Sequence, residues 1–177
     1  MYKFTQSLLT IICLLILTGC ASMQQRTGAV GHVSAAKEDP QLSKAKQFYL
    51  LGREHYQKNE YVEAVNAFEK AIGLKPDYYE AYGSLGVVYS ILGEGELGIS
   101  LINEAIKLAP SVSDLHNNLG YALLKQGRNA EAAGAFERAL QLDPRNVHAR
   151  NNLKSAYKLM GCTDGELCGQ WQEPKQP

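Results

Sequence analysis

Neither sign of charge is in excess in this 177-residue chain. Its 18 Lys and Arg residues balance its 18 Asp and Glu residues, so the formal net charge at pH 7 is zero. Proteins that follow a phosphate backbone are usually markedly basic. The composition therefore argues against nucleic-acid binding. Hydrophobic residues make up 45% and charged residues 20%, as is normal for a folded globular protein.

Motifs for catalysis and for metal binding are also missing. The sequence contains no phosphate loop, no nucleophile elbow and no cluster with metal-ligand spacing. His55 and His116 fall at positions where a repeated pattern, described below, has Tyr or Leu, so we expect packed core histidines rather than ligands or bases. We expect a protein that is not an enzyme and needs no cofactor, metal or small-molecule substrate. An enzyme remains the most distant alternative.

The chain lacks a hydrophobic run long enough to cross a membrane. Its apolar stretch, residues 8–17, is interrupted by Thr10 and Cys13 and falls short of the roughly 20 residues that a membrane-spanning helix needs. Lys3 is the one charged side chain before this stretch, and small residues follow it. A short basic start, a short apolar stretch and small residues are typical of a secretory signal, which we assign to residues 1–19.

Residues 17–20, Leu-Thr-Gly-Cys, resemble the lipobox of bacterial lipoproteins. The resemblance implies cleavage before Cys20, attachment of diacylglycerol to its thiol and acylation of the new amino terminus. Ala21 and Ser22 follow, where an Asp would favour retention in the inner membrane. We therefore expect a lipid anchor in the bacterial cell envelope, in the outer membrane facing the periplasm if the host has one. The alternative is an ordinary signal peptide with a chance cysteine.

Cysteine is rare, with four residues in the chain. Cys13 leaves with the signal and Cys20 is consumed by lipid, so Cys162 and Cys168 remain. Two thiols this close together in an oxidising compartment most simply form a local disulfide. The rival interpretation is a metal site, but no His or second Cys pair lies beside them in sequence.

Residues 20–44 are polar and rich in small residues and have no sustained period. They predict a flexible tether that begins at the lipidated Cys20. Asp39-Pro40, near its end, is a helix-start signal.

Periodicity begins at residue 45, and a shift of 34 residues superposes three units, 45–78, 79–112 and 113–146. Six columns of residues hold through all three units. The columns are Leu51, Leu85 and Leu119; Gly52, Gly86 and Gly120; Ala64, Gly98 and Ala132; Phe68, Ile102 and Phe136; Ala71, Ala105 and Ala139; and Pro76, Pro110 and Pro144.

Each unit predicts two antiparallel helices joined by a turn. In the first helix of the first unit, Phe48, Leu51 and His55 share one face. Gly52 lies inside that helix at a cost of about 1 kcal/mol relative to Ala. Because glycine recurs at this position, we expect a neighbouring helix that passes too close for a side chain. In the second helix, Phe68 stands between two alanines. One unit cannot bury its apolar face alone, and stacking of units buries it.

The period and the columns resemble the tetratricopeptide repeat (TPR). The resemblance implies an all-α, right-handed superhelical solenoid of three helix-turn-helix repeats. Residues 147–161 continue it for half a unit, but Lys154 replaces the glycine, so we expect a C-terminal capping helix there. A disulfide loop and a disordered tail should follow in residues 162–177. Gly98 and Ile102 depart from the pattern, so we expect the second helix of the second unit to be the least stable.

The resemblance also places a concave groove on the remaining face of the first helices. Tyr49, Arg53 and Tyr56 form one stripe there. We expect this stripe to be unnecessary for stacking, because Phe48, Leu51 and Ala64 already make the stacking contacts. Exposed Tyr and Arg beside apolar residues are typical of a contact surface. The alternative is a solvated face with scattered apolar residues. The predicted protein-binding groove residues are Lys46, Tyr49, Arg53, Tyr56, Val87, Ile91, Asn117, Asn118, Tyr121, Leu124, Lys125, Asn151 and Asn152.

Asn118 and Asn152 lie 34 residues apart, at equivalent places on successive helices. Some members of the family grip a peptide backbone with a ladder of such carboxamides, which both donate and accept hydrogen bonds. Leu50 and Ser84 interrupt the ladder here, so at most half of it is present. The alternative is a pair of surface asparagines without a ligand.

The family also contains a basic clamp for carboxyl-terminal peptides. The corresponding places hold Tyr49, Arg53, Ser84, Asp114 and Asn118. Only Arg53 is cationic, and Asp114 would repel a carboxylate. We do not expect this function.

These patterns together predict a membrane-anchored scaffold that binds a peptide or helix of another envelope protein. Small lipoproteins of this kind resemble assembly factors for pili and secretion systems, so we expect a role in assembling such a complex. The alternative is an adaptor that recruits cell-wall enzymes or polysaccharide-export components.

Overall fold

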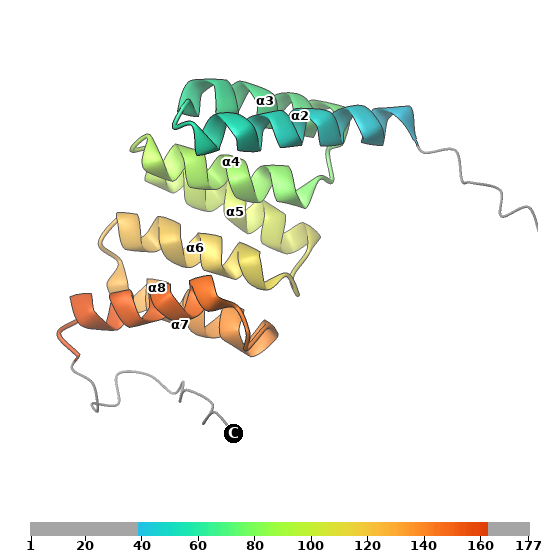
Figure 1. The fold of residues 1–177 in the computed structure, drawn as a ribbon. Coiled ribbons are helices and arrows are strands. Elements are labelled where there is room, and N and C mark those ends of the chain that lie inside the picture. The colour runs from blue at the N-terminus through green and yellow to red at the C-terminus, as the bar shows by residue number, and fades with distance from the viewer. Residues whose placement is uncertain (1–38, 163–177) are drawn as a thin grey trace, which may run out of the picture. The chain divides into compact units, whose positions relative to one another are not determined.

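The computed structural model describes residues 39–162 of the chain (Figure 1). These residues form seven α-helices and no strand: α2 (Pro40–Gln57), α3 (Tyr61–Leu74), α4 (Tyr79–Ile91), α5 (Gly95–Leu108), α6 (Ser113–Lys125), α7 (Asn129–Leu142) and α8 (Val147–Leu159). None of these helices is long and apolar enough to cross a lipid bilayer. The signal, Cys20, most of the tether and Cys168 lie outside the described residues.

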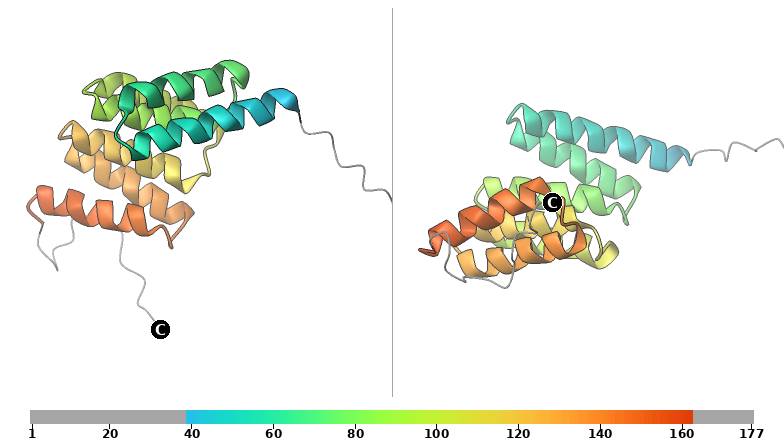
Figure 2. Two further views of the ribbon diagram at one scale, coloured as in Figure 1. Left: turned by 45° about the horizontal axis from the view of Figure 1, so that its top comes forward. Right: turned by 60° about the horizontal axis from the view of Figure 1, so that its bottom comes forward.

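The helices form three stacked antiparallel pairs and a final single helix. α2 packs on α3, α4 on α5 and α6 on α7, and α8 covers α7 (Figures 1 and 2). Successive pairs join because α3 contacts α4 and α5 contacts α6. The predicted all-α repeat solenoid is confirmed. The second and third pairs fall within the predicted units 79–112 and 113–146, whereas α2 begins before the first predicted unit, 45–78.

The first helix begins earlier than the repeat pattern, within the stretch assigned to the tether. The Asp39 carboxylate accepts a hydrogen bond from the backbone N–H of Gln41 at 2.9 Å, and Pro40 occupies the first turn. An acidic N-cap followed by proline is a strong start signal. Residues 40–44 are therefore helical.

A left-handed residue closes the turn after each first helix. Asn59, Gly93 and Gly127 have φ angles of 61°, 94° and 73°, and Gly161 repeats the conformation after α8 with φ 82°. Glycine, and less often asparagine, adopts this conformation at low cost. Because the position recurs after α8, this helix has the geometry of the first half of a fourth unit.

Beyond Gly161, the described part of the chain ends at Cys162. Cys162 takes part in a disulfide. Its expected partner, Cys168, lies outside the described residues, so the pairing of these two cysteines stays a prediction.

The glycine column makes room for an aromatic ring in the first and third units. A Cβ atom on Gly52 would lie 2.6 Å from Cε1 of Phe68, and one on Gly120 would lie 2.5 Å from Cε1 of Phe136. Both rings are fully buried. The close neighbour that we expected at these glycines is thus a phenylalanine from the second helix of the same unit.

In the second unit, the space beside the column glycine, Gly86, is filled by the backbone of α5 and by Ile102 instead of by an aromatic ring. A Cβ atom on Gly86 would lie 2.5 Å from the carbonyl oxygen of Gly98, and one on Gly98 would lie 2.3 Å from Oγ of Ser90. The buried Ser90 hydroxyl donates to the Gly86 carbonyl at 2.9 Å. With isoleucine at position 102 in place of a ring, α4 and α5 approach until their backbones touch. Gly98 therefore has a packing role, and the low stability that we expected of α5 stays a prediction.

The leucine column is most exposed where no described unit precedes it, and Leu119 in the third unit is half-buried. Leu85 is 3% exposed because it packs against Ala64 and Phe68 of the first unit, and Leu153 in α8 is 1% exposed. Leu51 is 41% exposed, since among the described helices none precedes α2. The expectation that Leu51 serves the stacking is therefore wrong.

We predict that Gly98→Ala destabilises the protein, although alanine is the residue that the other two units carry at this position. The methyl group would meet backbone and side-chain atoms of α4 at less than 3.0 Å, and such overpacking costs about 1–3 kcal/mol. The matched control is Gly134→Ala in α7, where no heavy atom lies within 4 Å of the added methyl group. It should gain about 0.5–1 kcal/mol from helix propensity. Urea unfolding followed by circular dichroism measures both, and equal stability of the two variants would contradict the packing role of Gly98.

Candidate protein-binding groove

The first helices of the repeats adjoin one another and form a continuous face. α2 contacts α4, α4 contacts α6, and α6 contacts α8. Two hollows open on this face. The smaller has a volume of about 170 Å³ and the larger about 450 Å³. They share Arg53, Ser84 and Asn118, so they form one groove.

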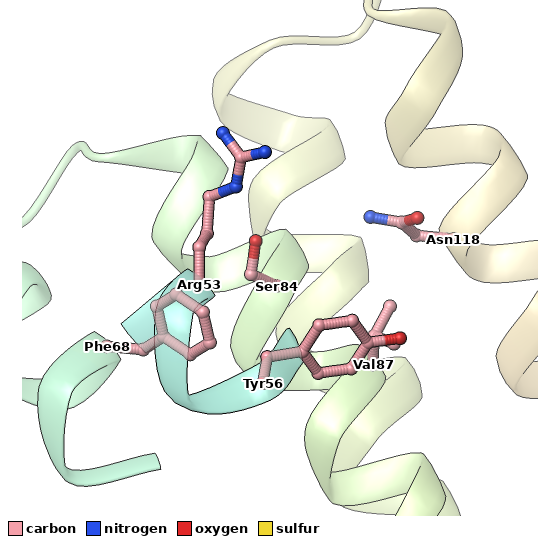
Figure 3. A pocket seen from close by; sticks show the side chains of 6 residues that line it. All are labelled: Arg53, Tyr56, Phe68, Ser84, Val87 and Asn118. Atoms are coloured by element: carbon pink, nitrogen blue, oxygen red, sulfur yellow. The ribbon is translucent and has the colours of Figure 1, made fainter. Parts of the chain in front are cut away.

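The smaller hollow is an apolar pocket with a polar rim (Figure 3). Phe68 and Val87 supply its apolar walls, and the Tyr56 ring lines the same pocket. Ser84 and Asn118 bring a hydroxyl and a carboxamide from α4 and α6. An apolar pocket with a few convergent polar groups is the common form of a binding site. It can take an apolar side chain while the rim hydrogen-bonds the backbone beside it.

Asn118 lies where the two hollows meet. It lines both hollows, and its side chain makes none of the hydrogen bonds formed within residues 39–162. Asn152 is different, because its Nδ2 donates to Oδ1 of Asn117 at 2.9 Å and so ties α8 to α6. The two asparagines of the expected half-ladder therefore have different surroundings.

Tyr49 contributes to packing between the first two units. Its ring centroid lies 5.9 Å from that of Phe68 and 5.3 Å from that of Tyr78. Burial, with smaller contributions from Glu80 and Tyr49, raises the pKa of Tyr78 to about 12. The expectation that the whole tyrosine stripe is unnecessary for stacking is wrong for Tyr49, because its side chain also packs against two core clusters that include Ala81 and Leu85 of α4.

Tyr56 belongs to a second aromatic group. Its ring centroid lies 6.2 Å from that of Tyr61, and its side chain remains half-exposed. Burial, followed by the nearby phenols of Tyr121 and Tyr61, raises the pKa of Tyr56. Of these three tyrosines, only Tyr56 lines the small pocket. Tyr61 was not among the expected groove residues.

A column of polar side chains, two of them carboxylates, lines the larger hollow. Glu80, Asp114 and His148 occupy the same position in successive units, near the starts of α4, α6 and α8, and all three line this hollow. Asn146 donates to the Asp114 carboxylate at 2.9 Å and holds it in place. Arg53, on the α2 side, lies 5.9 Å from the centre of the Tyr49 ring. The 34-residue spacing of this column is a sequence signal that could have identified it.

The structure gathers about half of the expected groove residues around the two hollows. These are Tyr49, Arg53, Tyr56, Val87, Asn117 and Asn118. Lys125 instead lines a separate hollow near the turn of the second unit. The others line neither of the two groove hollows; they are Lys46, Ile91, Tyr121, Leu124, Asn151 and Asn152.

The two histidines expected in the core are partly exposed and contact polar groups. Nδ1 of His55 lies 2.7 Å from a Glu60 carboxylate oxygen, and Nε2 of His116 lies 2.9 Å from the Pro110 carbonyl. Across residues 39–162, no three His, Cys, Asp or Glu side chains gather in a way that could hold a metal ion.

Comparison with known proteins agrees with the repeat pattern. Three family models match: "TPR repeat" over residues 52–93, and "Tetratricopeptide repeat" over residues 79–112 and again over 113–146. Among curated relatives, the small glutamine-rich tetratricopeptide repeat-containing protein 2 of Mycosarcoma maydis is 27% identical over 122 residues, which are 69% of this chain and 35% of that protein. DnaJ homolog subfamily C member 7 of Mus musculus is 30% identical over 116 residues, 66% of this chain and 24% of that protein.

This chain thus spans only about a quarter to a third of the length of these relatives. A solved structure, the first TPR of Spaghetti (RPAP3) bound to the HSP90 peptide SRMEEVD, superposes with a TM-score of 0.61 at 23% identity and covers 68% of this chain and 95% of that one. At this identity the similarity concerns the fold. From the family matches and the repeat columns, we conclude that residues 52–146 of this chain are repeats of the tetratricopeptide repeat family.

Proposed function

We propose that this protein is a non-enzymatic scaffold that holds an extended segment of another protein in the groove between α2, α4 and α6. One observation carries the proposal: an apolar pocket joins a wider polar hollow, and Asn118 lies between them without a hydrogen bond from the described residues. A related fold that has been solved with a peptide supports this use of the architecture.

The size of the small pocket fits one side chain. Its volume is about 170 Å³, and an engineered apolar cavity of about 150 Å³ accommodates benzene. The volume of a Leu, Met or Phe side chain is comparable to that of the pocket. A carboxamide such as that of Asn118 can donate to a backbone carbonyl and accept from a backbone N–H. The groove can therefore bind one apolar side chain and hydrogen-bond the peptide group next to it.

We further propose that the scaffold is anchored in the bacterial envelope through lipid on Cys20 and faces the periplasm from the outer membrane. The Leu-Thr-Gly-Cys sequence at residues 17–20 supports this proposal. The partner would be an envelope protein of a pilus or secretion complex, by resemblance to small repeat lipoproteins. An adaptor for cell-wall enzymes or polysaccharide-export components is the second candidate. A disulfide between Cys162 and Cys168 suits such an oxidising compartment.

If the groove binds a partner, the double variant Tyr56→Ala/Asn118→Ala should lose capture of that partner and keep its fold. Aromatic anchors and desolvated polar groups carry much of the energy of such contacts, often more than 1 kcal/mol each. Neither side chain is fully buried, whereas Tyr49 is unsuitable because it packs between units. The measurement is pull-down with the full-length chain from envelope extracts, alongside thermal melting.

The matched control is Asn103→Ala, an exposed asparagine on α5 that lines a different hollow. It should capture the same proteins as the wild type. If the double variant melts normally and still captures every protein that the wild type does, the groove is not the binding surface.

The anchor has its own test. Growth with labelled palmitate should mark the wild type and leave Cys20→Ala unlabelled, because the thiol of Cys20 is the expected attachment point. Two or more acyl chains make attachment stable where one is marginal, so the wild type should also stay with the membrane fraction. Equal labelling of the two proteins would refute the anchor.

A further inference from the structure

The charges of the groove are not symmetric. The carboxylates of Glu80 and Asp114 come from the adjoining helices α4 and α6, and both line the larger hollow. Arg53 is the one Lys or Arg side chain that lines either hollow. It lies beside the Tyr49 ring on the α2 side, where the two hollows meet.

No Lys or Arg of residues 39–162 forms an ion pair with either of these two carboxylates. The ion pairs formed within residues 39–162 include neither Glu80 nor Asp114. The hydrogen bond that Asp114 accepts comes from the neutral amide of Asn146 at 2.9 Å, which fixes the carboxylate and leaves its charge intact. The larger hollow therefore presents net negative charge next to an apolar pocket.

From this geometry we infer that the segment held in the groove is basic and apolar. An aliphatic or aromatic side chain enters the small pocket, and a Lys or Arg side chain a few residues away lies against Glu80 and Asp114. This inference rests on the proposed function and specifies its partner. Complementary charge steers encounter and selects among partners that share an apolar anchor.

An acidic segment is excluded by the same charges. A peptide such as SRMEEVD, bound by the related fold, carries several carboxylates beside one arginine. In this groove those carboxylates would meet two like charges and a single guanidinium. Like-charge contacts at a binding surface oppose association.

The test uses the full-length chain and three pools of labelled nine-residue peptides with blocked ends. All pools have Leu at the centre and random Gly, Ala and Ser elsewhere, except at two fixed positions on each side of the centre. These fixed positions hold Lys in the first pool, Gln in the second and Glu in the third. Fluorescence anisotropy at low ionic strength gives the apparent affinity of each pool.

Two double variants separate local from overall charge. Glu80→Gln/Asp114→Asn removes the two groove carboxylates and keeps an oxygen that can accept the Asn146 hydrogen bond. Glu63→Gln/Glu104→Gln removes two carboxylates from α3 and α5, outside both hollows, and is the matched control. Asn118→Ala reports whether binding occurs in the groove at all.

The Lys pool should bind best, and its advantage over the Gln pool should fall at least about fivefold in the Glu80→Gln/Asp114→Asn variant, in keeping with the loss of two partly exposed ion pairs. The control variant should keep the full advantage. The advantage should also shrink as salt shortens the roughly 10 Å range of screened charges at 0.1 M.

Two results would overturn the inference in distinguishable ways. If the Gln or Glu pool binds as well as the Lys pool, and Asn118→Ala abolishes that binding, the groove binds peptides but the assigned charge preference is wrong. If none of the three pools binds the wild-type chain, both the charge preference and the proposed peptide groove are wrong.

Discussion

The contact between a glycine of the first helix and a large side chain of the second decides how each repeat is built. At Gly52 and Gly120 the missing Cβ leaves space for the rings of Phe68 and Phe136, which are fully buried. A glycine in a helix interior costs about 0.5–1 kcal/mol relative to alanine, and burial of an aromatic side chain returns about 1.5–3 kcal/mol. The second unit satisfies the same constraint with touching backbones at Gly86 and Gly98.

Because this contact and the leucine column occupy one side of the first helices, the other side is left for a ligand. The adjoining first helices then place side chains from three units around one groove, with an apolar pocket at Val87 and carboxylates at Glu80 and Asp114. The two sides are not fully separate, since Tyr49 packs against core clusters shared by the first two units and also lines the larger hollow. Function in this family of folds depends on what the groove holds.

The period of 34 was enough to predict the helix pairs, because each column reports one contact that every unit repeats. The period did not predict burial in the first unit or the distance between the helices of the second unit. Leu51 fits the leucine column but is exposed, because no described unit precedes α2 and covers it. From the sequence, glycine in place of alanine at position 98 suggested a less stable helix. The sequence does not show how closely the backbones of α4 and α5 approach each other at this position. Glu80 and Asp114 lie 34 residues apart, so their equivalence could be predicted from the sequence. That both side chains line one hollow follows only from the structure.

A double-mutant cycle between Gly120 and Phe136 tests the central contact most directly. In the wild-type background, Gly120→Ala places a methyl group where the ring lies and should lower the free energy of unfolding by about 1–3 kcal/mol. In a Phe136→Ala background, which itself costs about 3–5 kcal/mol, the same methyl group enters empty space and should be neutral or stabilising. Urea unfolding at low temperature should therefore give a coupling energy above about 1 kcal/mol. Additive effects of the two substitutions would show that the glycine does not make room for the ring and would contradict this account.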